Sequence, residues 1–146
     1  MMNKIVIALD PEGVTEPVVK AGIDLARKLK ADVDIVSVVP RDVDLAVAAT
    51  GFINEERWDK ELQSALVYLF EIKMANTDLR INVDAFVGDP RQELRQYIQQ
   101  SNATFIVLGT HGRSGIGQVF MGGTAEYIVR HSTIPLVIVP LNNEEH

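Results

Sequence analysis

The chain contains no cysteine, which excludes disulfide bridges, thiolate metal sites and a cysteine nucleophile. It has no excess of basic residues either: 20 acidic side chains outnumber 14 basic ones, and the formal net charge is −6. Non-specific binding of nucleic acid depends on clustered Lys and Arg, and the sequence has no basic stripe. We therefore expect no nucleic-acid partner.

Long hydrophobic runs are also missing. No window approaches the roughly 18 apolar residues that a membrane-spanning helix needs, and the apolar run at the N-terminus is too short for a signal peptide. We expect no membrane partner and a cytoplasmic location. The 146 residues are close to the size of one domain, and a hydrophobic content of 47% suits a packed core. A single domain over residues 1–146 is the prediction.

Short apolar runs alternate along the chain with segments of helical periodicity. The runs, which we expect to be strands, are Lys4–Leu9, Val33–Val39, Arg80–Val87, Thr104–Leu108 and Pro135–Val139. The helical segments are Thr15–Lys30, Asn54–Ala75, the residues after Asp89, and Thr124–Arg130. Continuous apolar runs are typical of parallel strands that are buried on both faces. The alternation therefore predicts an α/β fold: a doubly wound parallel sheet between two helical layers.

Local signals predict details of these helices. Thr15 suits an N-cap position. Asp89 at the N-cap, Pro90 at the first helical position and Gln92 at the third form a capping-box arrangement. The apolar stripe expected along the long helix consists of Trp58, Leu62, Ala65, Leu66, Leu69 and Phe70.

A glycine-rich connection follows the fourth expected strand, and Asp10 follows the first. Ligands of doubly wound sheets bind beyond the carboxyl ends of the strands, where the winding direction reverses. Glycine allows close backbone approach, and free N–H groups before a helix can hold phosphate. If these two strands are neighbours, both loops face one crevice. Two plainer readings stay open: the connection is a surface loop, and Asp10 caps its own turn.

Two common phosphate motifs are incomplete in this connection. Gly117–Thr124 has the spacing of a P-loop, but Gly123 stands at the position of its lysine. Gly115 and Gly117 begin a dinucleotide fingerprint, yet Phe120 stands where its third glycine belongs. We therefore expect neither motif to bind phosphate in this chain.

The remaining pattern resembles the universal stress protein family, in particular its ATP-binding branch. Gly109 and Gly112 are separated by two residues, and nine residues separate Gly112 from Gly122. The strand at Val36–Val38, the Gly88-x-Pro90 turn and the closing PLVIVP segment extend the likeness over the whole chain.

This resemblance implies a fold like that of the adenine-nucleotide hydrolases, with five parallel strands in the order 3-2-1-4-5. It implies a homodimer in which Pro135–Val139 pairs antiparallel with its copy. It also implies a regulatory protein of the stress response that binds ATP, with ADP or AMP as alternatives, and Mg²⁺ arriving with the nucleotide. Its protein partners are unknown.

By position, the resemblance implies that Asp10 binds the adenine or the ribose of the nucleotide and that Val38 lines the pocket for the base. Gly109, Gly112 and Gly122 would bring backbone N–H groups to the ribose and phosphates. The full expected nucleotide-binding set is Ala8, Leu9, Asp10, Val38, Leu108, Gly109, His111, Gly112, Arg113, Gly122, Gly123 and Thr124. Arg113 either meets phosphate or forms a surface salt bridge. His131 is expected at a helix C-terminus rather than in catalysis.

One position departs from the family pattern: Gly123 stands where the family carries serine or threonine after the third glycine. Loss of one hydrogen bond to a charged partner costs about 1–3 kcal/mol, so weaker phosphate binding is expected, and Gly123→Ser should strengthen it. Two alternatives stay open, an interaction protein acting through its dimer surface and a slow ATPase. Because no metal-ligand cluster has diagnostic spacing, we expect no metal site of the protein's own, and binding rather than efficient catalysis.

Overall fold

The computed structural model describes residues 3–41, 49–50, 55–110 and 123–141. Its strands are β1 (Lys4–Leu9), β2 (Asp32–Pro40), β3 (Ile81–Gly88), β4 (Phe105–Gly109) and β5 (Leu136–Val139). Its helices are α1 (Glu16–Leu29), α3 (Glu55–Ala75), α4 (Pro90–Ser101) and α5 (Gly123–His131). Each predicted strand is present, and its bounds agree with the prediction to within one residue.

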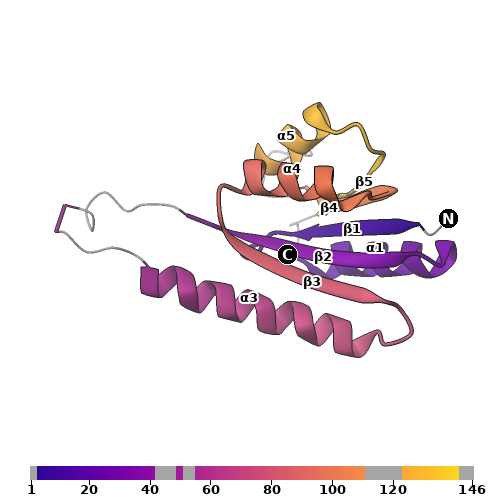
Figure 1. Ribbon diagram of the computed structural model, residues 1–146, viewed down its shortest axis with the longest axis horizontal. Coiled ribbons are helices and arrows are strands. Elements are labelled where there is room, and N and C mark those ends of the chain that lie inside the picture. Colours follow the sequence, from indigo (N-terminus) through magenta and orange to yellow (C-terminus); the bar gives the residue numbers. More distant parts are fainter. Residues whose placement is uncertain (1–2, 42–48, 51–54, 111–122, 142–146) are drawn as a thin grey trace, which may run out of the picture.

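The strands form one parallel sheet in the order β3-β2-β1-β4-β5 (Figure 1), which confirms the expected order. In the middle of the sheet, Ile7 of β1 pairs with Ile35 of β2 on one side and with Val107 of β4 on the other. All three side chains are fully buried. Helices cover both faces of these strands, which explains why the apolar runs are continuous rather than alternating.

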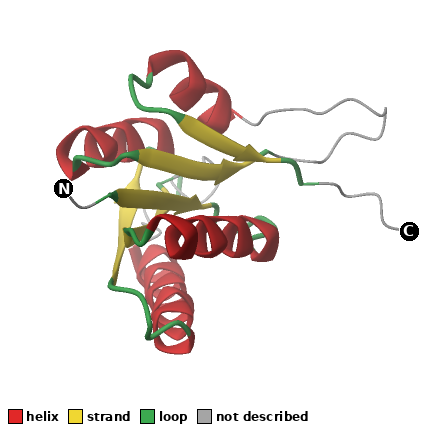
Figure 2. Ribbon diagram, turned by 90° about the vertical axis from the view of Figure 1, so that its right-hand side faces the viewer, coloured by secondary structure: helices red, strands yellow, loops and turns green. Residues whose placement is uncertain are grey.

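Each face of the sheet has its own hydrophobic core. Side chains of α1 and α3, among them Val18, Ile23 and Leu69, pack on one face. Side chains of α4 and α5, among them Leu94 and Ile128, pack on the other. Figures 1 and 2 show the sheet between these two helical layers. The predicted three-layer α/β architecture is therefore confirmed.

A glycine sets how closely α1 approaches the sheet. A Cβ atom at Gly22 would lie 2.6 Å from Cγ1 of Ile7, and Cδ1 of Ile7 would be closer still. Real Cβ atoms essentially never show such distances. The absence of a side chain at Gly22 therefore lets the helix axis settle against β1.

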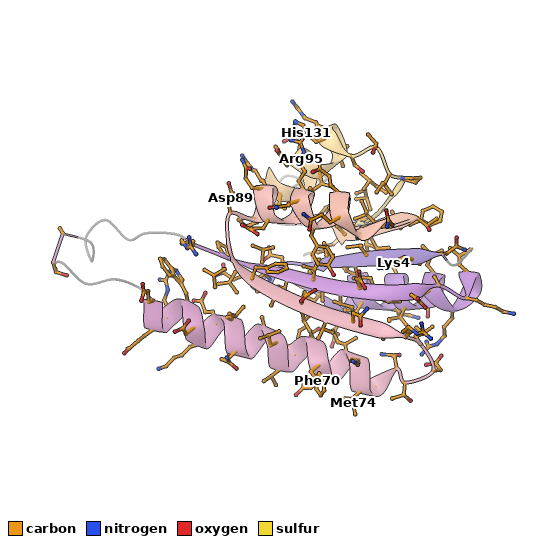
Figure 3. All side chains as sticks on the ribbon, in the orientation of Figure 1. Lys4, Phe70, Met74, Asp89, Arg95 and His131 are labelled. Atoms are coloured by element: carbon orange, nitrogen blue, oxygen red, sulfur yellow. The ribbon has the colours of Figure 1, made fainter. Side chains whose placement is uncertain are left out.

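Two local predictions need correction. Thr15 stands at the N-cap of α1, but its side chain makes no capping hydrogen bond. Its hydroxyl is instead within hydrogen-bond distance of the Tyr68 hydroxyl on α3, so it joins two helices. Phe70 was wrongly placed on the buried stripe of α3: it is 51% exposed, near Met74 on the outer side (Figure 3). The buried residues of this helix are Ala65, Leu69 and Ile72.

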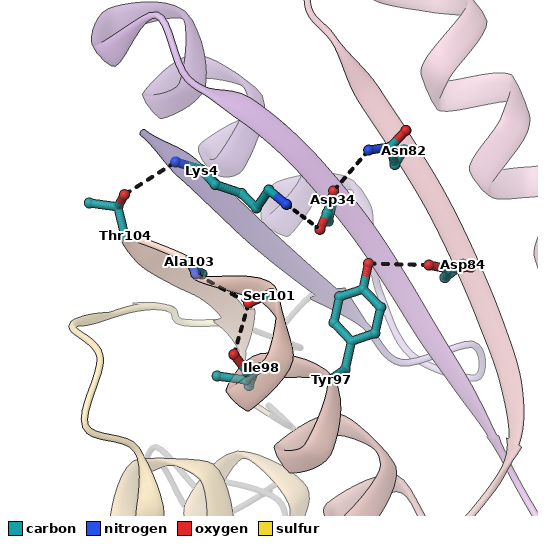
Figure 4. A network of polar contacts seen from close by, with 9 residues as sticks. All are labelled: Lys4, Asp34, Asn82, Asp84, Tyr97, Ile98, Ser101, Ala103 and Thr104. Carbon is teal, nitrogen blue, oxygen red and sulfur yellow. Dashed lines mark hydrogen bonds and ion pairs between the residues drawn. The ribbon is translucent and has the colours of Figure 1, made fainter. Parts of the chain in front are cut away.

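Polar side chains join the first three strands to α4 (Figure 4). Nζ of Lys4 lies 3.4 Å from a carboxylate oxygen of Asp34, which is 5% exposed, and Asn82 donates a hydrogen bond to the same carboxylate. The Tyr97 hydroxyl of α4 donates to Asp84 of β3 at 3.2 Å. Burial, followed by the negative charges of Asp34 and Asp84, raises the pKa of Tyr97. Among the described residues, no helix is both long enough and apolar enough to cross a membrane.

Candidate functional site

A pocket of about 580 Å³ opens at the carboxyl edge of the sheet. It lies where β1 and β4 are neighbours, which is the point at which the winding direction reverses. Its volume is within the range common for small-molecule sites. The lining residues are Ala8, Leu9, Asp10, Pro11, Glu12, Gly13, Val14, Val18, Val36, Val38, Pro40, Pro90, Leu94, Leu108, Gly109, Thr110, Thr124, Ala125 and Leu141.

The end of β1 and the turn after it form one side of the pocket. Oγ of buried Ser37 donates to the carbonyl oxygen of Leu9 at 3.0 Å, which fixes the end of β1 against β2. In the turn, the Asp10 carboxylate accepts a hydrogen bond from the Glu12 N–H at 2.9 Å. The Gly13 N–H donates to the Asp10 carbonyl at 3.0 Å. Asp10 thus has the turn-capping role that the sequence left open, and it also lines the pocket.

The end of β4 forms the back of the pocket. Thr110, only 3% exposed, donates its N–H to the Val139 carbonyl, and its hydroxyl accepts from the Leu141 N–H; both distances are 3.0 Å. A Cβ atom at Gly109 would lie 2.8 Å from side-chain atoms of both Val18 and Leu141. A glycine at this position therefore lets α1 and the segment after β5 meet at the pocket wall.

The starts of α4 and α5 form the opposite side. Asp89 caps α4, because its carboxylate accepts the Arg91 N–H at 3.1 Å, as predicted. Pro90 of the same helix lines the pocket together with Thr124 of α5. The first turn of a helix has N–H groups without intrahelical partners and the positive end of its dipole, and both favour an anion.

The predicted site residues fall into three groups. Those that line the pocket are Ala8, Leu9, Asp10, Val38, Leu108, Gly109 and Thr124. Gly123 begins α5, next to Thr124, and is not itself a lining residue. The predictions for His111, Gly112, Arg113 and Gly122 lie outside the described residues.

Several lining residues were missed by the sequence reasoning. Pro90 and Leu94 of α4 belong to the pocket because β3, like β1 and β4, ends at the carboxyl edge of the parallel sheet. The Gly88-x-Pro90 turn was the signal that could have found them. Val18 and Leu141 left no comparable signal, because they reach the site only through packing against Gly109.

The described lining is mainly apolar and carries two acidic side chains, Asp10 and Glu12, with no Lys or Arg among them. No group of three or more His, Asp or Glu side chains within the described ranges could hold a metal ion. His131 lies in the last turn of α5, as predicted, and its Nδ1 is 2.8 Å from the carbonyl oxygen of Tyr127. The pocket can therefore take a flat apolar group, with an anion beside the start of α5.

Comparison with known proteins assigns the family. The model of the universal stress protein family matches residues 1–140. The universal stress protein MJ0531 of Methanocaldococcus jannaschii is 27% identical over 148 aligned residues, which cover 99% of this chain and 86% of that protein. Sll1388 of Synechocystis is likewise 27% identical, with 94% of this chain and 97% of that protein covered.

Solved structures support the same fold. The universal stress protein UspA from Lactobacillus plantarum superposes with a TM-score of 0.78 at 17% identity, covering 94% of this chain and 97% of that one. A universal stress protein in complex with cAMP has a TM-score of 0.61 at 20% identity, covering 95% and 97%. The Archaeoglobus fulgidus protein in complex with dAMP has a TM-score of 0.60 at 17% identity, covering 95% and 98%.

Proposed function

The chain belongs to the universal stress protein family, and from this membership we propose that it is a regulatory protein that binds an adenine nucleotide, with ATP as the preferred ligand. The observation that carries the proposal is the pocket at the β1–β4 junction, because it brings Asp10 and Thr124 to one cavity from distant parts of the sequence. Two proteins of similar fold were solved with cAMP and with dAMP. Both ligands contain adenine.

In this proposal, the base lies against the apolar wall between β1 and β2. Leu9 and Val38 are 5% and 6% exposed and line the pocket, so they offer an apolar surface for a flat ring. Asp10 stands at the mouth and is exposed. Its carboxylate would accept a hydrogen bond from the base or from a ribose hydroxyl.

The phosphates, on the same proposal, lie toward the first turn of α5. Thr124 lines the pocket there, and Gly109 lies at the end of β4 on the same edge. The glycines at 112 and 122 would supply further backbone N–H groups, and Arg113 would supply a cation. Occupancy of the pocket would change the surface that partner proteins meet at this edge of the sheet.

Nucleotide binding is tested by two measurements on freshly purified protein. Denaturation followed by mass spectrometry identifies any co-purified nucleotide, and titration calorimetry measures binding of ATP, ADP and AMP. We expect saturable binding of ATP at one site per chain. Absence of both released nucleotide and heat with all three ligands would contradict the proposal.

A matched pair of variants tests the location of the site. Asp10→Ala should weaken binding about tenfold, the effect of one hydrogen bond to a charged group. Asp24→Ala removes the same charge from an exposed position on α1, where Asp24 pairs with Lys20 at 3.1 Å. It should leave the affinity unchanged. Equal effects of the two substitutions would show that Asp10 does not contact the ligand.

We further propose a homodimer that forms through Pro135–Val139. Among the described strands, β5 lies at the edge of the sheet and pairs only with β4, and its four residues are half-buried in the single chain. An exposed edge offers unpaired backbone groups to a second strand. Light scattering should give twice the chain mass, and a monomer at micromolar concentration would contradict the dimer. The cytoplasmic location stays a prediction.

A further inference from the structure

Arg91 lies at the junction of α4 and α5. It is the second residue of α4, and its own N–H is held by the Asp89 carboxylate. Its side chain reaches the first residue of α5: a Cβ atom at Gly123 would lie 2.6 Å from Nη2 of Arg91. The guanidinium therefore occupies the space that a side chain at position 123 would need.

This contact lies at the margin of the pocket. Pro90 and Thr124, the chain neighbours of the two residues in contact, both line the cavity. The lining itself contributes the acidic residues Asp10 and Glu12. Arg91 is not itself a lining residue, but its guanidinium beside Gly123 places a positive charge next to a pocket whose described charged lining residues are negative.

The Arg91 side chain is available to a ligand. It is exposed, and its guanidinium forms no hydrogen bond or ion pair with any residue that the structure describes. The other arginines of α4 and α5 each have a described partner: Nη1 of Arg95 donates to the Tyr127 hydroxyl at 3.0 Å, while its buried Nε has no described partner, and Arg130 pairs with Glu126 at 2.9 Å. Among the described residues, Arg91 is thus the arginine of these two helices whose guanidinium is exposed and has no hydrogen-bond or ion-pair partner.

We propose that Arg91 is the residue that gives this site its preference for di- and triphosphates over monophosphates. The inference rests on the proposed function, because it assigns the outer phosphates of that nucleotide to the guanidinium. A guanidinium presents a planar set of donors that matches two phosphate oxygens at once. It takes the place of the hydroxyl that the family carries at position 123, so glycine there makes room for a stronger phosphate ligand.

The first test compares ATP with AMP by titration calorimetry. In Arg91→Ala, ATP binding should weaken about 10- to 100-fold, which corresponds to the loss of charge-assisted hydrogen bonds. AMP binding should change less than about threefold. The matched control is Arg80→Ala, which removes an exposed arginine just before β3, at the opposite edge of the sheet. It should leave both affinities unchanged.

Two other results would contradict either the role of Arg91 or nucleotide binding itself. If Arg91→Ala weakens ATP no more than Arg80→Ala does, or weakens AMP as much as ATP, the assignment of Arg91 is wrong while the proposed function stands. If the wild-type protein binds neither nucleotide, the proposed function fails, and this inference fails with it.

A second test uses the crowding between positions 91 and 123. Gly123→Ser should displace the guanidinium, so in place of the gain expected from the sequence alone it should bring little or no gain in ATP affinity to the wild-type protein. In the Arg91→Ala background the space is open, and the serine hydroxyl should recover part of the lost affinity, about 5- to 10-fold. If Gly123→Ser has the same effect in both backgrounds, the two positions act independently, because the effects of independent sites are additive. This result would overturn the proposal that the Arg91 guanidinium takes the place of a hydroxyl at position 123.

Discussion

At the scale of single residues, Gly22 is the position where one added methyl group has the clearest consequence. Its missing side chain faces fully buried Ile7, and a Cβ atom there would overlap two atoms of that side chain. Alanine favours a helix over glycine by about 1 kcal/mol, but overpacking a core costs about 1–3 kcal/mol. The difference of these two terms is a net cost, and we expect Gly22→Ala to lower the free energy of unfolding by up to about 2 kcal/mol in urea denaturation.

The Ile7→Ala background provides the control for this prediction. With the isoleucine side chain removed, the added methyl group enters open space, and Gly22→Ala should become neutral or stabilising. A destabilisation of equal size in both backgrounds would show that the contact with Ile7 is not the cause.

Sequence reasoning at this scale succeeded where the signal was local. Asp89 was predicted as an N-cap because the residue types of a capping box occupy adjacent positions, and its bond to the Arg91 N–H confirms it. Thr15 carried a similar local signal, yet its hydroxyl is directed to Tyr68, 53 positions away in the sequence. A local pattern contains no information about such a competing partner.

At the scale of helices and strands, the polar contacts among β1, β2, β3 and α4 hold these elements in register. Asp34 is buried, with Lys4 and Asn82 as its partners. Removal of one partner leaves a buried charge less compensated. Because the Lys4 side chain is 32% exposed and Asn82 remains, we expect Lys4→Met to cost about 1–3 kcal/mol of unfolding free energy.

Lys20→Met is the matched control for this prediction. Lys20 pairs with Asp24 on the surface of α1, where its side chain is 78% exposed, and such pairs contribute about 0–1 kcal/mol. Urea denaturation of the two variants should therefore separate them. If Lys4→Met and Lys20→Met are equally stable, the ion pair with Lys4 does not stabilise the buried Asp34 carboxylate.

Tyr97 of α4 gives these contacts a pH dependence. Burial and the nearby carboxylates of Asp34 and Asp84 raise the pKa of its phenol in the folded state. The folded chain then retains this proton at a pH where the unfolded chain has lost it. The stabilisation is complete below the ordinary tyrosine pKa of about 10 and declines as the pH rises above it.

Ultraviolet titration of the phenolate measures this effect. Between pH 9 and about 11, native Tyr97→Phe should develop the same phenolate absorbance as the wild-type protein, because Tyr97 is still protonated in the wild type and the variant has no phenol at this position. A smaller phenolate signal in the variant over this range would show that Tyr97 ionises normally and would contradict the raised pKa.

Helix and strand bounds were largely predictable, whereas the buried face of α3 was predictable only in part: Ala65 and Leu69 are buried as expected, but Phe70 is not. The strands are continuous apolar runs, so they can be identified in the sequence without knowing which face of the sheet the helices cover. In α3, apolar residues occur on more than one side, and Val67, Phe70 and Met74 are each more than half exposed. Periodicity alone placed Phe70 on the buried stripe and missed Ile72, which packs against the sheet.

At the scale of the whole molecule, the order of the strands decides where the site lies. Because β4 is inserted next to β1, the segments after Leu9 and after Gly109 meet at one edge. The alternation of strands and helices predicted a parallel sheet, but the order itself came from the likeness to a family. The family model matching residues 1–140 confirms that likeness.

The composition of the pocket was only partly predictable from the sequence. Residues at the ends of β1, β2 and β4 could be named because strand ends are visible in the sequence. Leu141 and Val18 could not, since they meet at Gly109 from opposite ends of the chain. The contact of Arg91 with Gly123 joins residues of different helices in the same way, and no motif marks it.

In the proposed function, the pocket between β1 and β4 holds an adenine nucleotide, and we would test this first by mapping amide chemical shifts during titration with ATP. We expect saturable shifts centred on Asp10, Val38, Leu108 and Thr124, with none along the outer side of α3. Absence of shifts at saturating ATP, or shifts confined to residues away from the carboxyl edge of the sheet, would contradict it.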